Sequence, residues 1–316
     1  MLMRQVGRTD LQVSALCFGG NVFGWTCDEE TSFAVLDAFV AGGGNFIDTA
    51  DVYSAWAPGH SGGESEVILG KWLAQRKNRD QVVIATKVGA QMGSGEQGLS
   101  RKHIMQGVED SLRRLQTDHI DLYQAHVDDQ NVPLEETLEA FNQLVKAGKV
   151  RYIGASNYSA ERLTEALKIS SEQGYARYEC IQPPYHLLNR ATFEQALEPL
   201  CVEQQIGVIT YSSLASGFLT GKYRTNQQLP SSPRAQGIQQ KYMNEQGFTV
   251  LEQVEKIAKA HNATMTQVAL AWILARPGIT APIASATSVE QTRELLQAPA
   301  LNLSQDEIQA LDKASR

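Results

Sequence analysis

Hydrophobic and polar positions follow two alternating periods from one end of the chain to the other. Short apolar runs rich in Val and Ile, typical of buried strands, alternate with longer segments whose apolar residues recur at helical spacing. In residues 134–148, Leu134, Leu138 and Phe141 share one helical face, whereas Glu135 lies outside it. The clearest helical segments are Glu29–Gly43, Glu64–Gln75, Lys102–Gln116 and Leu134–Gly148. The pattern predicts strands at Val13–Gly20, Asn45–Ala50, Gln81–Val88, Ile120–His126, Val150–Asn157, Cys180–Tyr185, Gly207–Ser213 and Ala281–Thr287.

This alternation indicates the fold class. Eight strands separated by helices, with no Pro- or Ser-rich linker between them, predict one α/β domain over residues 1–316, a closed (β/α)8 TIM barrel. The opening residues Met3–Ser14 read as a β-hairpin that turns at Gly7–Asp10 and plugs the bottom of the barrel. An open doubly wound sheet is the alternative, but such a sheet normally has a G-x-G-x-x-G loop after its first strand, and the sequence has none there.

Two segments depart from the strand–helix repeat. A long loop, Leu214–Phe248, follows the seventh strand, and two additional helices, Thr249–His261 and Thr266–Ala275, precede the eighth. Long loops in compact domains are usually functional, so we expect this one to cover a ligand.

Composition and charge narrow the classes of function. The net charge of −7 argues against binding to nucleic acid or to an anionic membrane, and the longest apolar run, Val268–Ala275, is too short to cross a bilayer. Four cysteines lack CxxC spacing, and no His/Cys/Asp group has metal-ligand spacing. We therefore expect a cytoplasmic protein without a metal. Because the outer helical faces show no large apolar patch, a monomer is preferred to a homo-oligomer.

Polar residues follow three successive predicted strands. Asp48 ends the second strand, with Tyr53 just beyond it; Lys87 lies near the end of the third, and His126 ends the fourth. Each has an ordinary explanation on its own: a turn cap, a loop aromatic, a lysine reaching solvent, a core histidine. The carboxyl ends of barrel strands, however, form the active site of such enzymes, and the four explanations do not predict one another. Their joint occurrence therefore predicts a catalytic site.

The residue types suggest the chemistry. A phenol with a pKa near 10 is a poor proton donor at neutral pH, and an ammonium from Lys87 is expected to lower the pKa of Tyr53. Asp48 would hold the lysine, and His126 would orient a substrate oxygen. Such a set protonates an oxygen as negative charge develops on it, which carbonyl reduction by hydride requires. Because no side chain is a hydride source, a nicotinamide cofactor is implied.

Six segments resemble, in order, the motifs of the aldo-keto reductase family: NFIDTADVY, VVIATKVG, DLYQAHVDD, VRYIGASNY, IQPPYHLLNR and TYSSLASGFLTGKY. The resemblance extends from Met3 to about Leu303 and is closest to bacterial members that also resemble the β-subunits of voltage-gated potassium channels. It implies a reductase of aldehydes or ketones. In such an enzyme Asp48, Tyr53, Lys87 and His126 would be catalytic, with Tyr53 as the general acid.

The resemblance also implies cofactor contacts. Ser156, Asn157 and Gln182 would bind the nicotinamide carboxamide, and Tyr211 would stack on the ring. The pyrophosphate would be lined by Ser212, Leu214, Ala215, Gly217 and Lys222.

At the adenosine end the chain departs more from the family pattern. Gln291 and Glu294 match adenosine-contacting positions, whereas Ser285 replaces a glycine and Thr287 stands where a basic or small polar residue is usual. Arg234 resembles an arginine that grips a 2′-phosphate, which favours NADPH, with NADH as the alternative. A solvated surface charge is the ordinary explanation of Arg234.

The substrate pocket is less clear from the sequence. Trp25 and Trp56 suit a wall for an apolar or sugar-like carbonyl compound, and they equally suit loop anchors. Two other classes of function stay open: an NADP(H)-binding sensor or regulatory protein with slow turnover, and an aldolase or isomerase that uses Lys87 as a Schiff base.

Overall fold

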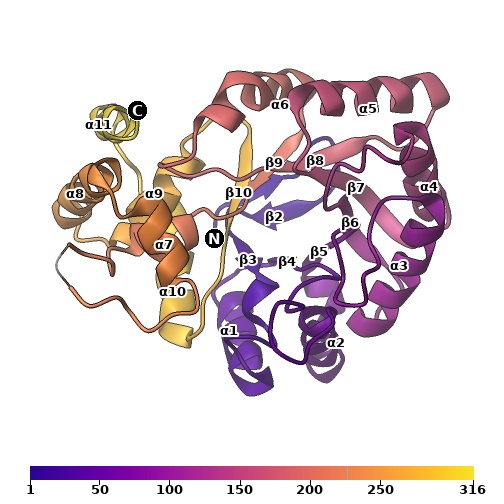
Figure 1. Ribbon diagram of the computed structural model, residues 1–316, viewed down its shortest axis with the longest axis horizontal. Coiled ribbons are helices and arrows are strands. Elements are labelled where there is room, and N and C mark those ends of the chain that lie inside the picture. Colours follow the sequence, from indigo (N-terminus) through magenta and orange to yellow (C-terminus); the bar gives the residue numbers. More distant parts are fainter. Residues whose placement is uncertain (226) are drawn as a thin grey trace.

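The computed structural model describes residues 1–225 and 227–316. Within these ranges, eight parallel strands close into a barrel in which the last strand pairs with the first, and helices surround it (Figure 1). The TIM barrel predicted from the sequence is confirmed. Its strands are β3 (Cys17–Gly19), β4 (Phe46–Asp48), β5 (Val83–Val88), β6 (Ile120–Ala125), β7 (Val150–Ser156), β8 (Tyr178–Gln182), β9 (Gly207–Thr210) and β10 (Ile279–Ala284).

Several of the helices begin where the sequence provides a capping side chain. Asp28, Ser100 and Ser159 each accept a hydrogen bond from a backbone N–H in the first turn of the following helix. No helix in the described residues is both long enough and apolar enough to cross a membrane. The helices are α1 (Glu29–Ala41), α2 (Glu64–Arg76), α3 (Arg101–Leu115), α4 (Leu134–Lys146), α5 (Ala160–Gln173), α6 (Glu198–Gln204), α7 (Ala235–Tyr242), α8 (Glu245–Ala260), α9 (Met265–Leu274), α10 (Val289–Gln297) and α11 (Gln305–Ala314).

The predicted hairpin is present, but the predicted first strand was wrong at its beginning. β1 (Met3–Gln5) pairs antiparallel with β2 (Gln12–Ser14), so residues 13 and 14 belong to the hairpin and not to the barrel. The chain bends between the two strands because the Ser14 hydroxyl donates to the Leu16 carbonyl, and the Ser14 N–H donates to Asn45 Oδ1. The apolar run therefore supplies two short strands with different partners.

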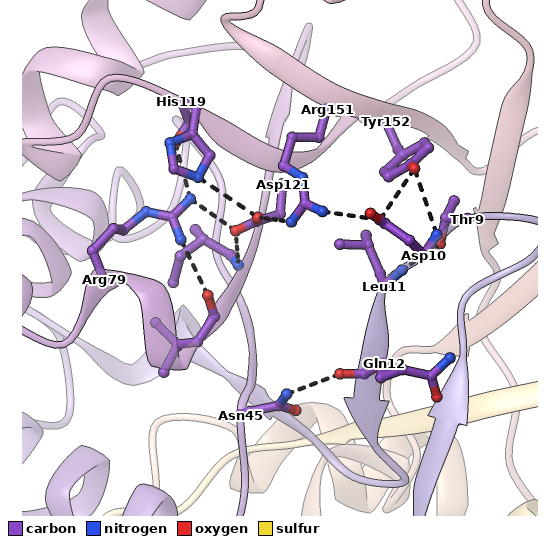
Figure 2. Close-up of polar contacts among 12 residues, drawn as sticks. Thr9, Asp10, Leu11, Gln12, Asn45, Arg79, His119, Asp121, Arg151 and Tyr152 are labelled. Atoms are coloured by element: carbon purple, nitrogen blue, oxygen red, sulfur yellow. Dashed lines mark hydrogen bonds and ion pairs between the residues drawn. The ribbon is translucent and has the colours of Figure 1, made fainter.

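The hairpin closes the amino-terminal end of the barrel. Its turn residue Asp10 accepts hydrogen bonds from Arg151 and Tyr152, near the start of β7 (Figure 2). Val6, Leu11 and Val13 pack with alternate strand residues such as Phe46 and Leu122 in the interior cluster. The polar residues that the sequence singled out lie at the opposite, carboxyl end of the strands.

The segment predicted as a long loop contains regular structure. It includes a 3₁₀ segment, η4 (Ala215–Thr220), then α7, and α8 begins inside it at Glu245. Asn226 lies outside the described residues. Phe218 stacks on Tyr242 with ring centroids 5.8 Å apart, and the Tyr242 hydroxyl lies 3.3 Å from His186 Nε2. The segment is thus anchored by buried aromatic residues on both sides of its central stretch.

Candidate active site

A buried lysine lies at the centre of the site. Lys87 Nζ donates to Asp48 Oδ2 at 2.7 Å, to the Thr49 carbonyl at 2.8 Å and to Tyr53 Oη at 2.9 Å. The register of β4 and β5 pairs Asp48 with Ala85, and Lys87, two residues further along, points to the same face. The side chains of Lys87 and Asp48 are 0% and 1% exposed, and a buried ion pair of this kind persists only when its hydrogen bonds are satisfied.

Asp48 connects the lysine to the rest of the site. Its Oδ2 also accepts a hydrogen bond from Tyr53 Oη at 3.2 Å, and its Oδ1 accepts one from Gln182 Nε2 at 2.9 Å. The Gln182 amide, predicted to bind a carboxamide, is therefore joined to the carboxylate that was predicted to be catalytic. Sequence reasoning missed the Thr49 contribution, because it comes from a backbone carbonyl that carries no residue-type signal.

The electrostatics of Tyr53 differ from the expectation. Burial raises the pKa of Tyr53 well above its usual value, and the charge of Asp48 and its hydrogen bond raise it further. The net shift is therefore opposite to the lowering expected from Lys87, because desolvation and the carboxylate dominate it. The phenol keeps its proton at neutral pH, which a proton donor requires.

His126 lies beside the phenol in a neutral state. Its ring and that of Tyr53 form an edge-to-face pair with centroids 6.1 Å apart. Burial, with a smaller effect of Lys87, lowers the pKa of His126 to about 3. A neutral imidazole can donate one hydrogen bond without adding a charge. In the described structure, the buried His126 Nδ1 has no hydrogen-bond partner.

A second network borders the histidine. Asn157 Nδ2 donates to the His126 carbonyl at 2.9 Å and to Ser156 Oγ at 3.1 Å, and Tyr211 Oη donates to Asn157 Oδ1 at 2.9 Å. Asn157 adopts a left-handed backbone with φ of 61°. The structure thus joins Ser156, Asn157 and Tyr211, which the sequence predicted as nicotinamide contacts, to the backbone of His126.

The segment after β9 has a backbone conformation that is suited to binding an anion. Positive φ angles occur at Ser212, Ala215, Ser216 and Gly217, and backbone of this type can point several N–H groups at an anion. A Cβ placed on Gly217 would lie 3.6 Å from Lys222 Nζ, so the lysine passes close to this backbone. Leu214 anchors the turn, because its carbonyl accepts from the N–H groups of Gly217 and Leu219.

Two cations of this segment lie near each other. Partial burial and the charge of Arg234 lower the pKa of Lys222. Neither side chain forms an ion pair with an acidic residue in the part of the chain that the structure describes. Two neighbouring cations without an acidic partner fit a phosphate-bearing ligand, so the donor set suits a dinucleotide.

The predicted adenosine contacts follow β10. The Thr287 N–H and hydroxyl both donate to Gln291 Oε1, at 2.9 and 3.2 Å, and Glu294 follows three residues later on α10. Ser285 Oγ donates to Asn21 Oδ1 at 2.6 Å, which ties β10 to the loop after β3. Ser285 and Thr287 thus lie on the connection between β10 and α10, and Gln291 and Glu294 lie on α10 itself.

Aromatic residues border the phenol on the other side. The ring of Trp56 lies 5.9 Å from that of Tyr53 and 5.6 Å from that of Trp25. The guanidinium of Arg234 lies 5.1 Å from the centroid of the Trp25 ring. Trp25 and Trp56 therefore form a wall next to Tyr53, and Trp25 also contacts the predicted phosphate-binding arginine.

Comparison with known proteins gives a consistent result. The model of the aldo/keto reductase family matches residues 15–316. The chain is 37% identical over 315 residues to the uncharacterized oxidoreductase YrpG of Bacillus subtilis, covering 97% of this chain and 94% of that protein. It is 32% identical to norsolorinic acid reductase of Aspergillus flavus, over 96% of this chain and 78% of that one. It is 33% identical to a probable voltage-gated potassium channel subunit beta of Arabidopsis thaliana, over 94% and 91% of the two chains.

Proposed function

The chain belongs to the aldo/keto reductase family, and from this membership we propose that it is an NADPH-dependent enzyme that reduces aldehydes or ketones to alcohols. The observation that carries the proposal is the junction of Lys87, Asp48 and Tyr53, in which a protonated phenol is held by a buried ammonium. His126, neutral and adjacent, completes the group.

Each of the four residues has a separate role in the proposed reduction. Tyr53 donates its proton to the carbonyl oxygen as negative charge develops there. Lys87 donates a hydrogen bond to Tyr53 Oη and so stabilises the charge that the phenol acquires in this step. Asp48 holds Lys87, and His126 donates a hydrogen bond to the same substrate oxygen.

The cofactor residues are proposed from their positions. Ser156, Asn157 and Gln182 would hold the carboxamide and Tyr211 would face the ring. The pyrophosphate would lie against Ser212, Leu214, Ala215, Gly217 and Lys222. The 2′-phosphate would bind Arg234, and the adenosine would contact Ser285, Thr287, Gln291 and Glu294. When bound, the nicotinamide supplies the hydride. NADPH is preferred to NADH because Arg234 and Lys222 together favour an additional phosphate.

The substrate is proposed to be a small carbonyl compound whose apolar part contacts Trp25 and Trp56. Such a wall leaves the carbonyl oxygen within reach of Tyr53 Oη and of the His126 ring. We propose that the enzyme acts as a monomer.

The test is the consumption of NADPH in the presence of a panel of aldehydes and ketones. Tyr53→Phe is expected to lower kcat by about 100-fold or more and to leave the NADPH dissociation constant nearly unchanged. Tyr152→Phe, which removes a phenol from the opposite end of the barrel, is the matched control and keeps wild-type kcat. An undiminished kcat in Tyr53→Phe removes this residue from its assigned role.

A second candidate function is an NADP(H)-binding regulatory protein with slow turnover. The likeness to a probable potassium channel subunit beta favours it. Tight NADPH binding without carbonyl-dependent turnover would support this function over the first. A Schiff-base role for Lys87 is disfavoured, since its ammonium is fully buried and engaged in three hydrogen bonds.

A further inference from the structure

A second buried charged cluster lies behind the catalytic residues. Asp51 follows Asp48 by three residues and precedes Tyr53 by two, and it is 3% exposed. Glu66 on α2 is 0% exposed, and Arg114 on α3 pairs with it at 2.7 Å. The cluster holds two carboxyl groups and one guanidinium, and none of the three residues has a role in the proposed reaction.

This cluster is connected to the catalytic lysine through the backbone. Glu66 Oε1 accepts a hydrogen bond from Thr86 Oγ1 at 2.5 Å, and Thr86 immediately precedes Lys87 on β5. The Asp51 N–H donates to the Lys87 carbonyl at 3.2 Å. The root of the loop that carries Tyr53 is therefore held to the strand that carries Lys87.

The surroundings of Asp51 cannot stabilise a negative charge well. The charged and titratable groups near enough to influence it are Glu66 on α2, Arg114 on α3, Lys87 on β5 and Tyr123 on β6. Arg114 Nε already donates to Glu66, and Lys87 uses its three hydrogens within the catalytic site. Asp51 Oδ1 is buried without a hydrogen-bond partner among the described residues.

The balance of these effects favours the protonated carboxyl group. Burial, followed by the charge of Glu66, raises the pKa of Asp51 to about 8, and Arg114, the Val52 backbone N–H and Lys87 offset only part of that rise. With Asp51 protonated, Glu66 and Arg114 form a neutral pair. With Asp51 ionised, the buried cluster carries an uncompensated negative charge.

We propose that Asp51 is a positioning residue that keeps Tyr53 in its reactive place only while the Asp51 carboxyl group carries a proton. An ionised Asp51 draws Arg114 away from Glu66 or pulls the loop toward solvent. Either movement displaces Tyr53, two residues away, and a displacement of about 1 Å in such a site can reduce the rate about 100-fold. This inference rests on the proposed reductase function.

The first test is the pH dependence of kcat for carbonyl reduction. In the wild-type enzyme kcat is expected to fall above about pH 8, by about tenfold for each pH unit if one group is responsible. Neither Tyr53 nor His126 titrates in this range, since their pKa values lie well above and far below it. Asp51→Asn, which imitates the protonated group, is expected to keep kcat at pH 7 and to lose the alkaline decline.

Two further variants make the result specific. Glu66→Gln removes the like charge, so the decline is expected to move to lower pH as the pKa of Asp51 falls. Asp121→Asn removes another buried carboxylate, which accepts from Arg79 and Arg151 at the opposite end of the barrel, and keeps the wild-type decline (Figure 2). A decline that persists unchanged in Asp51→Asn overturns the proposal, and if that variant does not fold, an unmoved decline in Glu66→Gln does so.

A measurement of unfolding tests the same inference without turnover. Because the folded-state pKa of Asp51 is raised, the wild-type protein loses stability as pH rises from the unfolded-state pKa of about 4 to about 8. The unfolding temperature of Asp51→Asn minus that of the wild type is therefore expected to grow across this window and to level off above it. A constant difference overturns the proposal for Asp51, whereas a growing difference without carbonyl reduction contradicts only the reductase function.

Discussion

Lys87 uses all three ammonium hydrogens inside the site, and this fixes the relation between Asp48, Tyr53 and the strand ends. Removing it does more than delete a charge. It leaves the Asp48 carboxylate buried with only the Tyr53 and Gln182 hydrogen bonds, and it leaves the phenol beside a carboxylate alone.

Lys87→Met is expected to lower the rate of alcohol oxidation and to move its rising limb to higher pH. The reason is that Asp48 already raises the pKa of Tyr53, and the ammonium that opposes this effect is gone. The free energy of unfolding is expected to fall by about 3–5 kcal/mol, since a buried charge loses its partner. The measurements are a pH profile of alcohol oxidation and denaturant unfolding.

The control is Lys71→Met, which breaks an exposed ion pair with Glu29 and should change the stability by less than about 1 kcal/mol. A pH profile that does not move in Lys87→Met contradicts the role given to the ammonium.

At the scale of single residues, the sequence predicted which residues form the site better than it predicted their pKa values. Asp48, Lys87 and His126 could be predicted to converge because strand ends of a barrel meet at one rim. The direction of the pKa shift of Tyr53 could not be predicted, since it depends on how completely the phenol is buried. The pKa shift of Asp51 could not be predicted either. Its Oδ1 lacks a hydrogen-bond partner among the described residues, and this depends on how α2 and α3 pack around it.

The element that most shapes the site is the segment from β9 to α7. It carries both Lys222 and Arg234, and Arg234 reaches across to Trp25 in the loop after β3. The sequence predicted a long loop here, because few apolar residues recur between 221 and 234. It did not predict that Phe218 and Tyr242 would anchor the two sides.

Arg234→Ala is expected to weaken NADPH binding by about 10- to 100-fold and NADH binding much less, because a charge-assisted hydrogen bond to phosphate contributes about 1.5–3 kcal/mol. Equilibrium titration with each dinucleotide measures the effect. Arg293→Ala, an exposed position on α10, serves as the comparison. Equal losses for NADPH and NADH would mean that the 2′-phosphate is held by another residue.

The packing of α2 on α3 depends on a missing side chain at Gly70. A Cβ there would overlap the backbone carbonyl of Arg114 and the backbone of Leu115. Gly70→Ala is therefore expected to lower the free energy of unfolding by about 1–3 kcal/mol, measured by denaturant unfolding. Gly237→Ala on α7, where an added Cβ meets no atom within 4 Å, should instead be neutral or stabilising by about 0.5–1 kcal/mol. Similar effects at both glycines would contradict the close approach.

For the whole molecule, the two ends of the barrel have different tasks. The carboxyl end gathers the reactive groups, and the amino end is held by a network in which Arg151 bridges Asp121 and Asp10 (Figure 2). The alternation of strands and helices was enough to predict this architecture, because few folds accommodate eight such repeats. The exact start of β3 could not be predicted, because the apolar run Val13–Gly20 contributes residues both to the hairpin and to the barrel.

Arg151→Ala is expected to reduce the unfolding free energy by about 1.5–3 kcal/mol, since it removes one hydrogen bond from the buried Asp121 and releases the hairpin turn. The kcat of the folded enzyme should not change, because the network lies at the end opposite Tyr53. Arg113→Ala, which breaks an exposed pair with Asp110, is the control and should cost less than about 1 kcal/mol. A large loss of kcat in Arg151→Ala, measured on folded protein, would contradict this separation of tasks.

The pairing of β10 with β3 has a consequence for biosynthesis. Cys17 and Phe18 find their neighbours, Ile283 and Ala284, only after 266 further residues have been synthesised. Until then the edges of β3 and β9 remain open and can pair with other nascent chains. Slow translation therefore prolongs the aggregation-prone interval, and a chaperone that shields strand edges is needed most just before residues 279–284 emerge.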